Sequence, residues 1–236
     1  MQEVIDEVVD RLSDYYPCRL QDWVTVRFSD ESEDYGSLTI HRSDSIAVIH
    51  LARLIHAQSL LPAAFYECRR QEHQDALIRG LTYGDEVVCL SKDDILLCLS
   101  ARQPLMEENT RIFKALLDFR STIGVQPDVC VTRSHCREAV ERLTYEAVDG
   151  GGLDDISPVG IWDVWLQQAY AEDVTRKPCG HCRRALLATF NQRREEAWEK
   201  LGKIFQVQVN RQRCGGQGKC LEPLCVHGLS DRHLGL

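Results

Sequence analysis

Residues 43–68 read SDSIAVIHLARLIHAQSLLPAAFYEC and contain two closely spaced apolar segments. In the first segment, apolar residues recur every three or four positions, which is the period of one helix face. In the second segment, Pro62 is compatible with a helix, because the first turn has no intrahelical partner for the missing N–H. This stretch therefore predicts two helices packed as a hairpin. The predicted buried face of the first helix is Ile46, Val48, Ile49, Ala52 and Ile55.

The same helical period recurs on both sides of this hairpin. Apolar stripes of this kind occupy residues 3–14, 105–123, 134–148, 161–171 and 181–205. Residues 79–90 differ, because Gly80, Gly84 and a run of β-branched residues favour extended structure. Ser91 and Asp94 then resemble a capping box that begins another helix. We therefore expect a mainly α fold, an irregular multi-helix bundle with at most a short β-hairpin, into which one structural zinc site would fit.

Composition and charge narrow the functional classes. Apolar residues make up 44% of the chain and charged residues 27%, which is ordinary for a folded protein. The net charge is -8, so the surface should repel phosphates, and nucleic acid is a disfavoured partner. No apolar run approaches the roughly 18 residues of a membrane helix, and the N-terminal residues lack the pattern of a signal peptide. We expect a cytoplasmic or nuclear protein, without a membrane partner, whose eleven cysteines stay reduced.

Four cysteines in the second half of the chain predict a metal site. Cys179 and Cys182 are separated by two residues, a spacing that lets two thiolates bind one metal ion. Cys130 and Cys136, on the other side of a glycine-rich stretch, supply a second pair, although their spacing is wider than in common zinc fingers. The sequence thus predicts one structural Zn²⁺ bound by these four thiolates, since closed four-ligand sites are the usual structural form. Alternative ligands are His135 and His181.

The tetrapeptide Cys179-Gly180-His181-Cys182 also allows redox chemistry. It resembles the active site of disulfide isomerases, and a helix N-terminus would lower the pKa of the first thiol. Such a motif normally follows a buried strand, whereas a helical and then polar stretch precedes it here, with Pro178 in place of an aromatic residue. A thiol-disulfide oxidoreductase is therefore the second hypothesis. Two cysteines without a ligand at a helix start are a third interpretation.

Other catalytic arrangements are weak. The sequence has no glycine-rich phosphate loop, no nucleophile elbow and no His-Glu-x-x-His pair. We therefore expect no enzymatic activity and no small-molecule substrate. A zinc-containing transcriptional regulator is a further alternative, which the acidic charge disfavours.

Residues 124–127, from Gly124 to Pro127, are a predicted boundary between two halves of the chain. A helical region over residues 1–124 is followed by a helical, cysteine-containing region over residues 125–206. Residues 207–236 lack apolar periodicity, so we predict a disordered tail, even though it contains Cys214, Cys220, Cys225 and His227. The cysteines in apolar runs are predicted to be small core residues. These are Cys68, Cys89 and Cys98.

Short motifs within residues 1–205 occur in a characteristic order. They are residues 3–17 ending in Tyr16-Pro17, residues 20–23, residues 46–55 and 60–68, residues 90–94 with Cys98, Leu99 and Arg102, the Cys179 and Cys182 pair, and residues 194–201 with Phe205. Residues 46–68 are the most specific part. In this order the motifs resemble the region after the BTB/POZ domain in BTB-domain proteins of basidiomycete fungi.

The resemblance implies protein–protein interaction, in transcriptional control or in the assembly of ubiquitin-ligase adaptors. It also implies a BTB domain ahead of residue 1, so we expect this chain to be a fragment, a truncated gene model or a degenerate relative. Dimerisation through that domain is not expected of the present chain. The sequence therefore predicts a non-enzymatic interaction module, an adaptor or regulator, whose partners are other proteins.

Overall fold

The computed structural model of the protein describes residues 2–28, 44–70, 74–123, 130, 132–149, 157–159 and 177–208. Helices dominate this part of the chain, and the one sheet within it is a two-stranded antiparallel hairpin, which confirms the predicted fold class. The elements are α1 (Gln2–Tyr15), α2 (Leu20–Phe28), α3 (Ser45–Leu54), α4 (Leu61–Arg70), α5 (Gln74–Arg79), β1 (Leu81–Tyr83), β2 (Glu86–Val88), α6 (Lys92–Ser100), α7 (Arg102–Thr122), α8 (Arg133–Asp149), α10 (Gly180–Glu199) and α11 (Leu201–Ile204).

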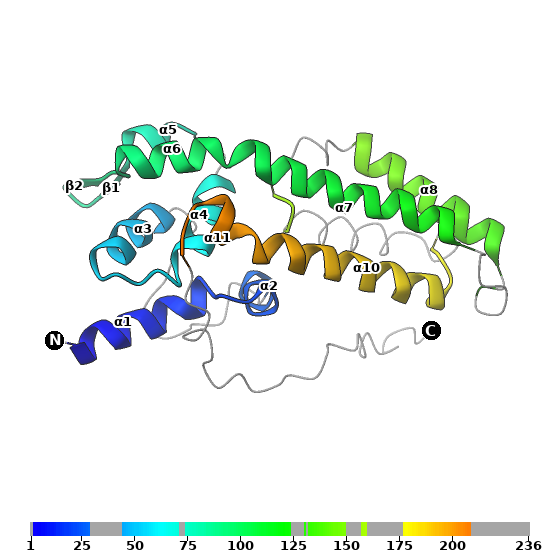
Figure 1. Ribbon diagram of the computed structural model, residues 1–236, viewed down its shortest axis with the longest axis horizontal. Helices are drawn as coiled ribbons and strands as arrows, with labels where there is room; N and C mark the ends of the chain where they lie inside the picture. The colour runs from blue at the N-terminus through cyan, green and yellow to red at the C-terminus, as the bar shows by residue number, and fades with distance from the viewer. Residues whose placement is uncertain are drawn as a thin grey trace, which may run out of the picture.

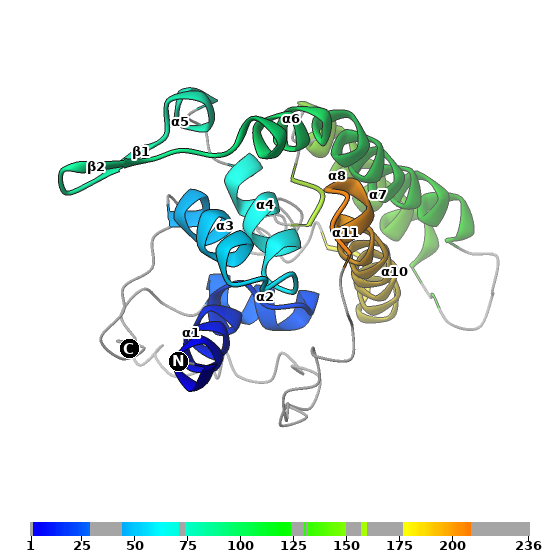
Figure 2. The same cartoon turned by 60° about the vertical axis from the view of Figure 1, so that its left-hand side comes forward.

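Two long helices, α7 and α10, run side by side along the molecule (Figure 1). α8 packs on α7, and α11 follows α10 and packs on α4. α1 and α3 lie at one end of the molecule, and the first turns of α8 and α10 lie at the other (Figure 1). Figure 2 shows the β1–β2 hairpin projecting from the body beside α5. Among the described helices, none combines the length and apolar composition that a membrane crossing requires.

α3 and α4 form the predicted helical hairpin at the centre of the core. α3 ends at Leu54 rather than at Ala57, because the chain closes a Schellman motif there. The Ala57 N–H donates to the Ala52 carbonyl at 2.8 Å and the His56 N–H to the Arg53 carbonyl at 3.4 Å. His56 occupies the left-handed region with φ of 58°. A glycine is usual at this position, so the sequence did not indicate the stop.

The predicted helix over residues 181–205 is divided into α10 and α11. Lys200 separates the two helices. α11 ends in the same kind of turn as α3, with Gln206 at φ 52° and the Val207 N–H donating to the Gly202 carbonyl at 2.7 Å. Helices α2 and α5 were not predicted from the sequence, because their apolar residues lack a clear stripe. α6 begins as predicted, because the Ser91 hydroxyl accepts from the Asp94 N–H at 3.1 Å.

The predicted extended segment is the β1–β2 hairpin. Leu81 pairs with Val88 and Tyr83 with Glu86, which leaves a two-residue loop that begins with Gly84. Gly84 has φ of 60°, as the first central position of a tight hairpin turn requires. Gly80 has φ of 80° and lies against the second strand. Gly84 is therefore required by the turn geometry alone, whereas Gly80 is required by both its φ angle and the close approach of β2.

Replacement of Gly80 by alanine should lower the free energy of unfolding by about 2 kcal/mol, through backbone strain and overpacking. A Cβ atom at Gly80 would lie 2.5 Å from the carbonyl oxygen of Val88 and 2.6 Å from Sγ of Cys89. Gly84→Ala is the matched control, because nothing lies within 4 Å of a Cβ there. Its expected cost is about 1 kcal/mol, from strain alone. Equal shifts of the two urea midpoints would show that the contact with β2 has no energetic weight.

The three cysteines that were predicted to be core residues differ in burial. Cys68 and Cys98 are fully buried, as predicted. The prediction for Cys89 is wrong, because this residue follows the projecting hairpin and is exposed. Its Sγ atom lies 3.5 Å from the carbonyl oxygen of Arg79. Of the apolar residues beside Cys89, the strand residues Val87 and Val88 are exposed and partly buried, and Leu90 after the strand is buried.

A buried polar network fastens residues 157–159 between α4 and α10. The Tyr66 hydroxyl lies 3.1 Å from the Ser157 hydroxyl and accepts from the Val159 N–H at 3.1 Å. Arg194, on α10, donates from Nε to the carbonyl of Val159 at 2.9 Å. Burial raises the pKa of Tyr66, so this side chain keeps its proton. The network fixes the position of α10 relative to α4.

One hydrophobic core includes residues from both sides of the predicted boundary at residue 124. Val207, the first residue of the predicted tail, is buried against this core. Residues 209–236 lie outside the described part of the chain, as do the predicted helix over residues 161–171 and the glycines at 150–152. The predicted division into regions and the predicted disorder of the tail stay predictions.

Candidate metal centre

Four thiols from two parts of the chain meet where α8 and α10 begin. Cys130 precedes α8, and Cys136 lies in its first turn. Cys179 is the residue before α10, and Cys182 lies one turn further on the same side of the helix. The four Sγ atoms all lie within 4.8 Å of one another, and they are the group of potential metal ligands found among the described residues.

The spacing of the sulfur atoms fits a tetrahedral thiolate site. With Zn–S bonds of about 2.3 Å, two sulfurs of a regular tetrahedron are about 3.8 Å apart. The Sγ atoms of Cys179 and Cys130 are separated by 3.9 Å. All four cysteines are free thiols. The arrangement can therefore enclose one metal ion with little movement.

Local hydrogen bonds hold the sulfur of Cys136 in place. The backbone N–H of Cys179 donates to this sulfur at 3.2 Å, and the Thr132 hydroxyl lies 3.5 Å from it. Hydrogen bonds of this kind orient ligands around a metal and stabilise negative charge on sulfur. Thr132 was not among the site residues predicted from the sequence. Its position four residues before Cys136 is the signal that could have suggested it.

Three of the thiols, Cys136, Cys179 and Cys182, have shifted pKa values. Burial raises the pKa of Cys136 and also that of Cys182, whose hydrogen bonds with Cys130 and Cys179 raise it further. Burial raises the pKa of Cys179 as well, but hydrogen bonds from the Cys182 backbone and from the neighbouring thiols outweigh burial and lower it to about 7. A metal cation in the cluster would displace the remaining protons, because thiolate is the ligand form.

The two candidate histidines do not belong to the cluster. The ring Nε2 of His135 lies 2.8 Å from the carbonyl oxygen of Lys177, so this side chain links the first turn of α8 to the segment before α10. His181 is exposed on α10. The donor set that the structure brings together is thus four sulfurs, which is a set that favours Zn²⁺ and other soft metals.

A cavity of about 330 Å³ opens beside Cys179. Its lining includes Thr132, His135, Lys177 and Arg183. Cys130, Cys136 and Cys182 are at most 5% exposed, whereas Cys179 is half-buried. Solvent therefore meets this group of thiols mainly at one sulfur.

No known protein family, curated protein or solved structure matches the chain. The similarity to the region after fungal BTB domains stays a prediction. The potential ligands of the tail, from Cys214 to His227, lie outside the described residues.

Proposed function

We propose that the protein is a non-enzymatic, helical interaction module stiffened by one structural Zn²⁺, whose ligands are Cys130, Cys136, Cys179 and Cys182. The observation that supports the metal most directly is the meeting of four sulfurs within 4.8 Å, three of them buried. Four protein ligands fill a tetrahedral zinc and leave no position for a substrate. A structural role follows better from this arrangement than a catalytic one.

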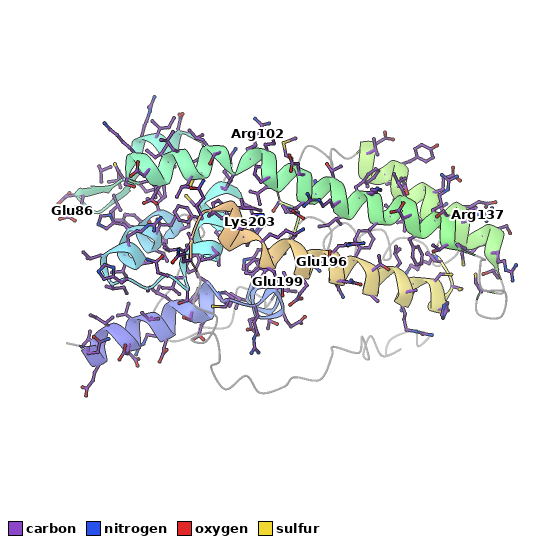
Figure 3. All side chains as sticks on the ribbon, viewed as in Figure 1. Glu86, Arg102, Arg137, Glu196, Glu199 and Lys203 are labelled. Atoms are coloured by element: carbon purple, nitrogen blue, oxygen red, sulfur yellow. The ribbon has the colours of Figure 1, made fainter. Side chains whose placement is uncertain are left out.

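The location of the cluster supports the same role. It lies at the end of the molecule away from α1 and α3, where α8 and α10 start (Figure 1). Arg137 connects α8 to the end of α7, because its guanidinium donates to the carbonyl of Ile123 at 3.4 Å. Figure 3 shows Arg137 near this end. A metal here would join the starts of α8 and α10 and stabilise both.

Exposed apolar side chains support a protein partner. Leu96 and Leu99 lie one turn apart on α6 and are 63% and 48% exposed. A cavity of about 690 Å³ next to Leu99 is lined by Leu99, Met106 and six polar or charged residues of α6 and α7. Exposed apolar side chains with a polar rim are a surface that partner proteins commonly cover. A cytoplasmic or nuclear site of action accords with four reduced thiols.

Metal analysis of the purified full chain tests the zinc site. We expect one zinc per chain, with four thiols that become reactive toward a thiol reagent only after chelation, because ligation protects them. Elemental analysis by mass spectrometry and thiol titration before and after chelation give both numbers. A metal-free chain with four reactive thiols in the cluster would exclude the proposed site.

The second candidate is a thiol-disulfide oxidoreductase. It is favoured by the pKa of about 7 at Cys179, which is half-buried at a helix N-terminus. The strands among the described residues are β1 and β2, which end before Cys89, and residues 160–176, which precede the motif, lie outside them. Catalysis of insulin reduction by the metal-free protein, dependent on both Cys179 and Cys182, would favour this candidate over the structural site. A zinc-containing regulator that contacts DNA is less compatible with the net charge of -8.

A further inference from the structure

One of the four ligands is accessible in a way that the other three are not. Cys179 lines the 330 Å³ cavity, whereas Cys130, Cys136 and Cys182 do not. A thiolate bound to zinc retains a lone pair and can still attack an electrophilic sulfur. A small disulfide that enters the cavity would therefore meet Cys179 first.

Basic side chains line the cavity beside Cys179. Lys177 and Arg183 contribute to its lining, and no aspartate or glutamate does. The N-terminus of α10, a helix of 20 residues, begins at Gly180 on the cavity wall and adds a partial positive charge. These basic groups offset the net negative charge that four thiolates and one Zn²⁺ would carry, and they attract small anions to the cavity. The reactant that fits is a disulfide that carries carboxylates, such as glutathione disulfide.

Cys182 is placed to complete the reaction. It lies three residues after Cys179, and the two sulfurs are within 4.8 Å. Two thiols at this spacing at a helix start can form a disulfide with small movements of the side chains. Cys182 is 4% exposed, so a mixed disulfide at Cys179 is closer to it than any solvent thiol is.

We infer that the zinc site is a redox-sensitive clasp, which an anionic disulfide opens at Cys179; the inference rests on the zinc site proposed above. The thiolate of Cys179 attacks one sulfur of the disulfide, forms a mixed disulfide and expels one thiolate. The thiolate of Cys182 then attacks the sulfur of Cys179 and expels the second thiolate. Cys179 and Cys182 lose two electrons, the small disulfide gains them, and Zn²⁺ leaves because only Cys130 and Cys136 remain as thiolates.

Treatment of the zinc-loaded full chain with glutathione disulfide tests the clasp. We expect release of one zinc per chain, followed with a chromogenic chelator, and a Cys179–Cys182 disulfide in peptide maps. Reduction and added zinc should restore the starting state. The exposed Cys89 is an internal reference, because it should form only a mixed disulfide. Retention of zinc while Cys89 is modified would overturn the inference and leave the zinc site intact.

Charge reversal at the cavity separates entry through Cys179 from general oxidation. Lys177→Glu changes the lining but none of the ligands, and Lys203→Glu makes the same change of charge on α11, away from the start of α10 (Figure 3). We expect Lys177→Glu to slow zinc release by glutathione disulfide about fivefold, as loss of a short-range attraction implies. Lys203→Glu should leave the rate unchanged, and neutral hydroxyethyl disulfide should not distinguish the variants.

The failures of the two proposals can be told apart. A chain that binds no zinc overturns the proposed site, and the clasp falls with it. A chain that binds zinc but releases it equally fast from Lys177→Glu and Lys203→Glu overturns only the entry of an anion at Cys179. A disulfide between Cys130 and Cys136 in the oxidised protein has the same meaning.

Discussion

Serine in place of Cys136 should abolish tight zinc binding and lower the free energy of unfolding by at least about 3 kcal/mol, a large loss for one substitution. The sulfur of Cys136 is fully buried and accepts a hydrogen bond from the backbone of Cys179, so no water can replace it as a ligand. In a domain of this size the thermal midpoint should fall by roughly 6–12 °C. Thermal unfolding followed by circular dichroism measures the shift.

A comparison with chelation separates loss of metal from loss of packing. A chelator should lower the midpoint of the unchanged protein by a similar amount and should have no further effect on Cys136→Ser. Cys89→Ser is the matched control, since this exposed thiol lies outside the cluster. Its expected effect is within about 0.5 kcal/mol. An unchanged midpoint with chelator would mean that metal does not contribute to stability.

The sequence could indicate the four sulfurs because their spacing and chemistry are local properties. Cys179 and Cys182 lie in one turn, and such a pair needs a second pair to complete a tetrahedron. The meeting with Cys130 and Cys136, by contrast, depends on the packing of both α8 and α10 on α7. Periodicity predicts that these helices have apolar faces, but it does not say which faces meet.

The fold class could be predicted because apolar stripes determine it, but helix ends could not. α3 and α11 both stop at left-handed residues that are not glycine, His56 and Gln206. Hydrogen bonds to the preceding turn stabilise this geometry once the neighbouring core is in place. α2 illustrates the same limit, because its helical packing depends on a tertiary contact of Trp23 and not on a stripe.

Trp23→Ala should be the most damaging change in the apolar core, with a loss of about 3–5 kcal/mol. Trp23 is 1% exposed and joins α2 to α4 and α10. Its ring centroid lies 5.8 Å from that of Tyr66 and 5.4 Å from that of Trp198. The guanidinium of Arg70 lies 5.3 Å from the ring centroid, which adds a cation–π contact. Alanine would leave a cavity among three helices.

Trp23→Phe separates the contribution of ring packing to the free energy of unfolding from that of the indole hydrogen bond. The indole Nε1 donates to Oε1 of Glu67 at 2.8 Å, and Glu67 is 1% exposed. Phenylalanine keeps most of the ring contacts but removes that donor, which should cost about 1–3 kcal/mol because a buried carboxylate loses a hydrogen bond. Urea unfolding with a constant slope measures both variants. If Trp23→Phe were as stable as the unchanged protein, the hydrogen bond to Glu67 would contribute nothing, and packing alone would hold α2 against the core.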